Sequence, residues 1–326
     1  MKKLIAAEMP VKGKSAYITV LYEDDVPVEI YADSPEEKTA VGDIYVGHIE
    51  RVLDSAGGAF VRFKEDERGF LPFGRMKEAV FCSAKKDPAP KAGDELLVRV
   101  EAESYANKQA VLNAKIKLPG EENRLAEIKE KGIHRPAGTC LYKAPAPWKF
   151  LIEKYKKEAF SRIVTDVSKI CDDLDGAADL YEDKMLSLYK LYDLQTLLER
   201  SLQKRVWLPS GGQLVIEQTE AFVSIDVNSS KAVKGKAADE AFLKINMEAA
   251  KEAALQIRRR QLSGTILVDF ISMKSKDAKK ELIGYMKELA EQDPVYTSVI
   301  DITALGIMEL TRHKVRKSLH RQIEEL

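Results

Sequence analysis

The chain has 326 residues, of which 32% are charged and 45% are hydrophobic, and its formal net charge is zero. This length is about twice that of a typical domain, so more than one folding unit is expected. The composition excludes a collagenous or low-complexity chain. A zero charge balance gives no overall attraction to nucleic acid, although locally basic segments such as Arg258–Arg260 leave that kind of partner open.

Cysteine usage and hydropathy narrow the class of protein further. Cys82, Cys140 and Cys171 are widely spaced and form no CxxC motif, so neither a disulfide framework nor a structural zinc site is expected. No apolar run approaches the roughly 18 residues that a membrane span needs. The N-terminus also has no signal-peptide pattern. We therefore expect no membrane span and a cytoplasmic location.

The first third of the chain has the pattern of short strands. Residues 16–24 and 26–32 are rich in β-branched and aromatic side chains and flank the acidic turn Asp24–Asp25. This pattern predicts a β-hairpin. From Gly42 to Leu118, five short strands are separated by glycine-rich and proline-rich turns, which predicts a small barrel.

The rest of the chain alternates strands with helices. A charged helix is expected within Pro119–Gly138, and an amphipathic helix at Leu186–Leu202. From Val206 onward the pattern predicts, in order, three strands, a helix at Ala237–Gln261, an apolar strand, a helix at Asp277–Gln292, a strand, and a helix from Ile307 to the end. This order is typical of an α/β domain.

Two carboxylates interrupt otherwise apolar strands of this α/β segment. Asp226 lies in FVSIDVN and Asp269 in ILVDFIS. If both strands belong to one sheet, the two acids come close together and repel each other unless a cation lies between them. Mg²⁺ prefers oxygen ligands of this kind, and Asn228 faces the same side of its strand as Asp226. The alternative, equally open, is that each acid caps a strand end or pairs with an arginine from Arg258–Arg260.

Two aromatic residues lie on adjacent strands of the predicted barrel. Phe60 and Phe70 could stack on bases of single-stranded nucleic acid, with phosphate contacts from Arg62, Arg68 and Lys108. A phenylalanine on a strand is more often part of the core, and the pattern does not decide which face Phe60 takes.

Taken together, these blocks resemble the ribonuclease E/G family. SGGQLVIEQTEAFVSIDVNSSKA, SGTILVDFISM and TALGIMELTRHKVRKSL are similar to its catalytic segments, in the family's order. Upstream, GDIYVGHIERVLDSAGGAFVRF and RGFLPF resemble its S1 RNA-binding domain. The resemblance implies an α+β multidomain fold, in which an S1-type OB barrel is inserted in an RNase H-like subdomain and an α/β DNase I-like catalytic domain follows.

The resemblance also implies domain limits. They are residues 1–37 and 157–204 for the two parts of the RNase H-like subdomain, 38–118 for the S1 domain, 119–156 for a reduced 5′-sensor region, and 205–326 for the DNase I-like domain.

For the chemistry, the resemblance implies a magnesium-dependent endoribonuclease. It would cut single-stranded, A/U-rich RNA in RNA processing or decay and leave a 5′-phosphate and a 3′-hydroxyl. Asp226 and Asp269 would be catalytic and bind Mg²⁺, with Asn228 as a supporting catalytic residue. Phe60, Phe70 and Lys108 would contact RNA.

Three departures from the family pattern qualify this expectation. The 5′-phosphate pocket keeps Arg135 but has Pro136 in place of a threonine, so we expect weak dependence on the 5′ end. Ser272 replaces a second acid, which predicts reduced metal affinity. The chain also lacks the family's cysteine-rich zinc link, so we expect no zinc-linked dimer. The alternatives are a non-catalytic RNA-binding protein on the same scaffold and, against the barrel evidence, a small-molecule enzyme.

Overall fold

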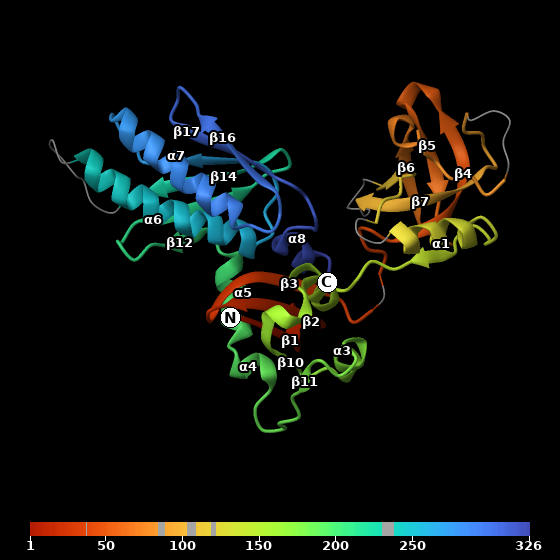
Figure 1. Cartoon of the computed structure of the whole chain (residues 1–326), viewed down its shortest axis with the longest axis horizontal. Helices are drawn as coiled ribbons and strands as arrows, with labels where there is room; N and C mark the ends of the chain where they lie inside the picture. The colour runs from red at the N-terminus through yellow and green to blue at the C-terminus, as the bar shows by residue number, and fades with distance from the viewer. Residues whose placement is uncertain (37, 84–88, 103–108, 119–121, 230–237) are drawn as a thin grey trace. The chain divides into compact units, whose positions relative to one another are not determined.

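The computed structural model describes residues 1–36, 38–83, 89–102, 109–118, 122–229 and 238–326. Two compact units divide the chain (Figure 1). One consists of Met1–Pro35 together with Ala146–Leu326, and the other is the intervening segment Glu36–Pro145. No helix in the described ranges has the length and hydrophobicity that crossing a membrane requires.

The first unit begins with a five-stranded sheet. Its strands, in spatial order, are β11 (Asp179–Leu180), β10 (Phe160–Thr165), β1 (Lys2–Val11), β2 (Lys14–Glu23) and β3 (Val26–Asp33). The predicted hairpin is β2–β3, whose turn residues Asp24 and Asp25 both have positive φ, as a tight two-residue turn requires. β1 was not predicted. It pairs with β2 and, in parallel, with β10.

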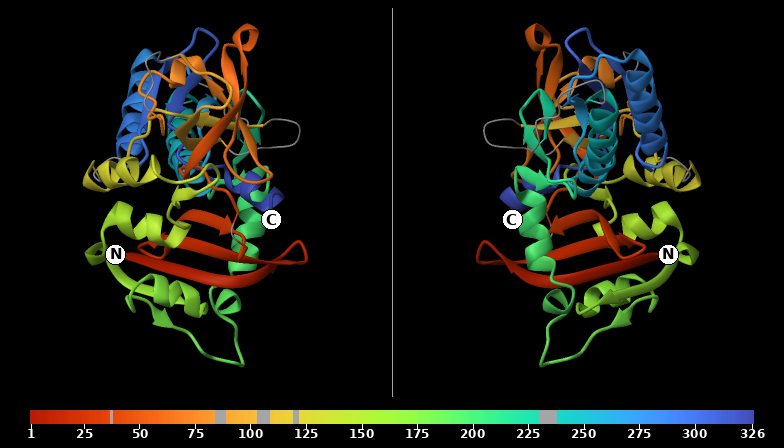
Figure 2. Two further views of the ribbon diagram at one scale, coloured as in Figure 1. Left: turned by 90° about the vertical axis from the view of Figure 1, so that its right-hand side faces the viewer. Right: turned by 90° about the vertical axis from the view of Figure 1, so that its left-hand side faces the viewer.

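Helices pack on both faces of this sheet (Figure 2). One face carries α2 (Pro147–Tyr155) and α3 (Ser168–Asp173), and the other carries α4 (Leu188–Leu191), α5 (Leu194–Leu202) and α8 (Leu319–Glu324). The predicted helix at Leu186–Leu202 is two helices, because Asp193 between α4 and α5 has a left-handed backbone with φ +48°. A short 3₁₀ helix at Lys157–Ala159 precedes β10.

The second sheet of this unit has six strands and one helical layer. The strands, in spatial order, are β12 (Arg205–Trp207), β13 (Gln213–Gln218), β14 (Phe222–Asn228), β15 (Gly264–Asp269), β17 (Ile307–Arg312) and β16 (Thr297–Ile302). Two helices, α6 (Ala238–Arg259) and α7 (Lys276–Glu291), pack their alanine and leucine side chains on one face. The other face presents mostly polar side chains, so each strand alternates in burial.

The prediction of a helix from Ile307 to the end is wrong. Residues Ile307–Arg312 form β17, which pairs with both β15 and β16, and only α8 is helical. The strand pattern is hidden because Ile307 lies on the polar face while Arg312 lies on the buried one. Arg312 is buried because it forms an ion pair with Asp293, at 2.7 Å between Nε and Oδ2.

The second unit contains a closed five-stranded barrel, consistent with the OB type. Its strands, in order around the barrel, are β4 (Ile44–Leu53), β5 (Gly58–Arg62), β6 (Arg68–Pro72), β8 (Ala110–Asn113) and β7 (Glu95–Ala102). Closure comes from β4, which pairs with β5 and with β7. The unit also contains α1 (Glu122–Gly132), a short strand β9 (Cys140–Tyr142) on β4, and 3₁₀ turns at Asp54–Ala56 and Phe73–Arg75.

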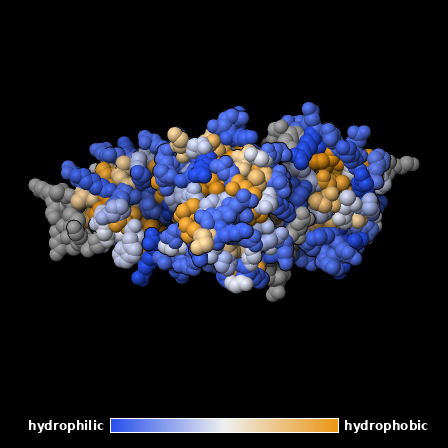
Figure 3. Space-filling view, turned by 90° about the horizontal axis from the view of Figure 1, so that it is seen from below, coloured by the Kyte–Doolittle hydropathy of each residue, from blue (hydrophilic) through white to orange (hydrophobic). Residues whose placement is uncertain are grey.

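Charged residues cover much of the molecule, in keeping with the composition. Seen from below, the surface is mainly hydrophilic, and hydrophobic residues form patches between the charged ones (Figure 3). The basic run Arg258–Arg260 is an exception to this surface placement, because all three guanidinium groups are largely buried inside the first unit.

Arg258, in the last turn of α6, joins the second sheet to the first. Its guanidinium donates to Glu29 at 3.2 Å and to both carboxylate oxygens of Glu23, at 2.8 and 3.0 Å. Glu29 is fully buried on β3 and also accepts from Lys154, Tyr155 and Tyr31. Burial alone would raise the pKa of Glu29, but the nearby positive charges and tyrosine hydroxyls hold it below the ordinary value.

We expect Arg258→Met to destabilise the first unit by about 3–5 kcal/mol, because it leaves the Glu29 carboxylate buried without its guanidinium partner. Urea unfolding at neutral pH measures this. Lys204→Met is the matched control, since Lys204 pairs with Glu217 on the exposed surface and should contribute less than about 1 kcal/mol. Equal effects of the two substitutions would contradict the structural role of Arg258.

The same network predicts a pH dependence. Because the folded pKa of Glu29 lies below its unfolded value of 4.5, its ionised form stabilises the fold above that pH, and this contribution is lost as the pH falls through the folded pKa. The difference in melting temperature between the wild type and Glu29→Gln should therefore be largest near neutral pH and shrink in acid. A difference that stays constant down to acid pH would count against an ionised Glu29.

Candidate functional site

The two acids that the sequence singles out are direct neighbours. β14 and β15 are adjacent parallel strands, and Asp226 and Asp269 are register partners at their carboxyl ends. Both side chains are exposed on the face of the sheet opposite α6 and α7, whereas the adjoining Val227 and Val268 are buried on the helical side. Neighbouring strands are about 4.8 Å apart, so two like charges face each other at close range.

Asn228 lies on the same face, two residues after Asp226. Its Nδ2 donates a hydrogen bond of 2.5 Å to Oδ2 of Asp226. This bond fixes the direction of one carboxylate oxygen and leaves the other free to accept. The structure therefore brings all three predicted catalytic residues together at the carboxyl ends of the two central strands β14 and β15.

The alternative that arginines neutralise these acids is wrong. Arg258 binds Glu23 and Glu29, Arg259 donates to the carbonyl of Pro27, and Arg260 donates to the carbonyl of Gln203. In the part of the chain that the structure describes, neither Asp226 nor Asp269 forms an ion pair. Among the described residues, no cation therefore competes with a ligand for these two charges.

The residues present fit a hard divalent cation. Mg²⁺ is commonly held by one or two carboxylates and completes its octahedron with water and substrate phosphate. Asp226 and Asp269 supply such a pair on an open surface. Within the described ranges no group of three or more His, Cys, Asp or Glu side chains could hold a metal ion, so a closed site built only of protein ligands is not found there.

A residue that the sequence analysis missed holds the segment following Asp269. Asn246 on α6 is fully buried, and its carboxamide pairs with both backbone groups of Ile271: Nδ2 donates to the carbonyl at 2.8 Å and Oδ1 accepts from N–H at 3.0 Å. An asparagine inside a long helix has poor helix propensity, and that was the available signal. Asn246 thereby positions the end of β15.

The barrel carries the predicted aromatic pair on its outer surface. Phe60 and Phe70 are register partners on β5 and β6, with ring centroids 5.7 Å apart in an edge-to-face arrangement. Both are half-buried, whereas Ala59, Val61 and Leu71 fill the barrel interior. The two phenylalanines are therefore outside the barrel core, and part of each side chain is exposed.

The charged residues near this pair differ in their availability. Arg62 and Arg68 both form ion pairs with Glu50, at 3.4 and 2.9 Å. Arg51, opposite Phe60 on β4, is exposed. The remaining predicted contact, Lys108, lies outside the described residues.

Arg135, the predicted 5′-phosphate residue, is exposed in the turn between α1 and β9. The turn is held on the barrel because Gly138 donates to the carbonyl of Val46 at 2.7 Å, and Gly138 has φ +92°. Thr139 donates through its hydroxyl to the carbonyl of Pro136. Arg135 belongs to the second unit, and the acids belong to the first.

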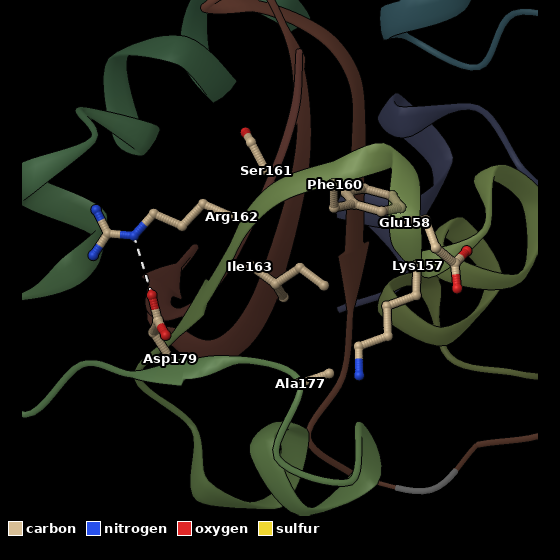
Figure 4. Close-up of a pocket in the computed structure, with 8 residues that line it drawn as sticks. All are labelled: Lys157, Glu158, Phe160, Ser161, Arg162, Ile163, Ala177 and Asp179. Carbon is tan, nitrogen blue, oxygen red and sulfur yellow. Dashed lines mark hydrogen bonds and ion pairs between the residues drawn. The ribbon is translucent and has the colours of Figure 1, made fainter.

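A separate cavity of about 460 Å³ lies along the outer edge of β10 (Figure 4). Its lining comes from the 3₁₀ helix before β10, from β10 itself and from the start of β11 and the segment before it, and it includes positively and negatively charged side chains: Lys157, Glu158, Phe160, Ser161, Arg162, Ile163, Ala177 and Asp179. Arg162 and Asp179 pair with each other at 3.2 Å. None of the predicted site residues lines this cavity.

Comparison with known proteins identifies a family and several relatives of this chain. The model of the ribonuclease E/G family matches residues 76–315. Ribonuclease E from Escherichia coli (strain K12) is 28% identical over 92% of this chain and 35% of its own length. Ribonuclease G from the same strain is 25% identical over 97% of this chain and 81% of its own length. A chloroplastic ribonuclease E/G-like protein from Arabidopsis thaliana is 33% identical over 60% of this chain and 21% of its own length.

The family match covers well over half of the chain, so the chain belongs to the ribonuclease E/G family. It spans about a third of the Escherichia coli ribonuclease E that it matches.

We expect Asn246→Leu to reduce stability by about 1–3 kcal/mol, because both backbone groups of Ile271 lose their buried partner. Urea unfolding measures this change. Lys244→Leu, two residues away on the exposed side of α6, is the control and should change stability by no more than about 0.5 kcal/mol. An Asn246→Leu variant as stable as this control would show that the carboxamide does not hold the segment.

Proposed function

We propose that this chain is a magnesium-dependent endoribonuclease that cuts single-stranded, A/U-rich RNA and leaves a 5′-phosphate and a 3′-hydroxyl. The observation that carries the proposal is the pairing of Asp226 with Asp269 on an open sheet face, in a member of a ribonuclease family. Like charges directly opposite each other destabilise a sheet, which makes a ligand between them the simplest reason for the arrangement.

In this proposal Asp226 and Asp269 hold the metal ion. Bound there, Mg²⁺ would activate water as the nucleophile and stabilise the charge that builds up on the scissile phosphate. Asn228 holds Oδ2 of Asp226 through its hydrogen bond and so keeps that carboxylate in one orientation. Asn246 fixes the backbone just beyond Asp269, which limits the movement of the second carboxylate.

The barrel would bind the RNA strand. A half-buried edge-to-face pair outside the barrel core, such as Phe60 and Phe70, offers a base a flat apolar surface, and stacking of this kind tolerates many sequences. Arg51 is placed to contact phosphate beside Phe60, while Arg62 and Arg68 would first have to leave Glu50. We propose that this barrel is an S1 domain.

The finer structural expectations belong to the same proposal. The five-stranded sheet with helices on both faces would be the RNase H-like subdomain, and the six-stranded sheet the DNase I-like domain. Weak use of the 5′ end through Arg135, reduced metal affinity from Ser272 and a cytoplasmic location stay predictions.

We expect Asp226→Asn and Asp269→Asn each to lower the rate of RNA cleavage by more than about 100-fold, since even the partners of metal ligands contribute 10–100-fold. RNA affinity measured in EDTA should change little. Asp301→Asn, an exposed carboxylate on β16 of the same sheet, serves as the control. Binding without Mg²⁺-dependent cleavage by the wild type would instead favour a non-catalytic RNA-binding protein.

Phe60→Ala should weaken binding of single-stranded RNA by about 1–3 kcal/mol while leaving the melting temperature nearly unchanged, because the ring lies outside the barrel core. Phe63→Leu is the matched comparison: Phe63 is fully buried, so this substitution should lower the melting temperature and spare the affinity of the folded protein. If Phe60→Ala behaves like Phe63→Leu, the ring is structural.

A further inference from the structure

Two exposed side chains on the edge strand β12 share the open face with the acid pair. Trp207 is 70% exposed, and Arg205, two residues earlier, is also exposed. Val206 between them points to the helical side and packs against the core of the second sheet. The alternation of the strand therefore presents an arginine and a tryptophan side by side on one surface.

The register of the sheet places these residues in line with the site. Trp207 is the partner of Gln213, which in turn is the partner of Asn228. Arg205 is the partner of Val215, the next position in that row is Asp226, and Asp269 follows. Two strand spacings, about 10 Å, separate β12 from β14.

The chemistry of these two side chains is suited to a nucleotide. A large aromatic ring on an edge strand, with most of its surface in water, has no packing role that a polar residue would not fill. Its flat face complements a nucleobase. In the described part of the chain Arg205 forms no ion pair, and a guanidinium binds phosphate oxygens through two parallel hydrogen bonds.

We propose that Arg205 and Trp207 form a subsite for single-stranded RNA beside the acid pair. Trp207 stacks on a base flanking the scissile phosphate, which would lie beside Asp226 and Asp269, and Arg205 binds a neighbouring phosphate. This inference rests on the proposed function, because it places the same RNA on the same sheet face. The subsite adds affinity and position without selecting a particular base.

Tryptophan fluorescence tests the stacking directly. The chain has two tryptophans, and Trp148 is only 4% exposed in the core of the first sheet, so Trp207 is the one that a ligand can reach. The wild type is titrated in EDTA with a short A/U-rich single-stranded RNA, which allows binding without cleavage. Emission should be quenched on saturation, and Trp207→Phe should abolish the response.

Affinities of variants then separate the two side chains. Trp207→Ala should weaken RNA binding about 5- to 150-fold, and Trp207→Phe, which keeps a ring, by less than about 3-fold. In the cleavage assay Trp207→Ala should raise KM and leave kcat nearly unchanged. Arg205→Gln should reduce the slope of log affinity against log salt by about 0.7, the value for one phosphate contact on a single strand.

Tyr296→Ala is the matched control. Tyr296 is 65% exposed at the opposite edge of the same sheet, where its ring contacts His313, and its loss should change affinity by less than about twofold. Circular dichroism and melting temperature confirm that each variant is folded. If Tyr296→Ala weakens binding as much as Trp207→Ala, no specific subsite exists on β12.

The outcomes distinguish this inference from the proposed function. RNA cleavage by the wild type, together with an unquenched Trp207 and a Trp207→Ala variant of wild-type affinity, overturns the subsite and leaves the nuclease intact. Quenching and loss of affinity without any cleavage support the subsite and overturn the nuclease. A wild type that does not bind the RNA overturns both.

Discussion

The buried carboxylate of Glu29 and its guanidinium partner Arg258 form the constraint on which the first unit depends. An ionised side chain inside a protein is tolerated only with close partners, and Glu29 has them from β3, α2 and α6 at once. The end of α6 is thereby held at the first sheet. Earlier in α6, Asn246 holds the backbone beyond Asp269. One helix therefore connects the buried charge network to the position of the second aspartate.

The single helical layer on the second sheet explains why the site is located where it is. Since α6 and α7 cover one face only, every second residue of β14 and β15 faces away from the core. A carboxylate at such a position remains hydrated, so it needs no buried partner to neutralise its charge. Parallel pairing then places the two carboxyl ends at the same edge. Asp226 and Asp269 can therefore be ionised on this sheet without the desolvation cost that the buried Glu29 incurs.

Much of this arrangement could be predicted from the sequence, and the failures have physical causes. The barrel strands, α6 and α7 follow from sequence pattern and composition. The sequence also shows that Asp226 and Asp269 interrupt apolar strands, whereas their pairing followed only if both strands belonged to one sheet. β17 was missed because an outward Ile307 and an inward Arg312 hide its period. The locations of Arg258 and Asn246 depend on contacts between segments far apart in the chain, and no local pattern contains that information. The open edge formed by Arg205 and Trp207 emerges only once the strand register is known.

The barrel interrupts the first sheet in the sequence, and this has a consequence for how the protein folds. β1 pairs with β10, and the register partners Lys2 and Phe160 lie on opposite sides of the whole Glu36–Pro145 segment. Closing so long a loop slows folding, but the entropic penalty grows only logarithmically with its length. If the barrel folds first, it shortens the effective loop that β10 must close. Assembly of the first sheet would then wait for the inserted segment to become compact.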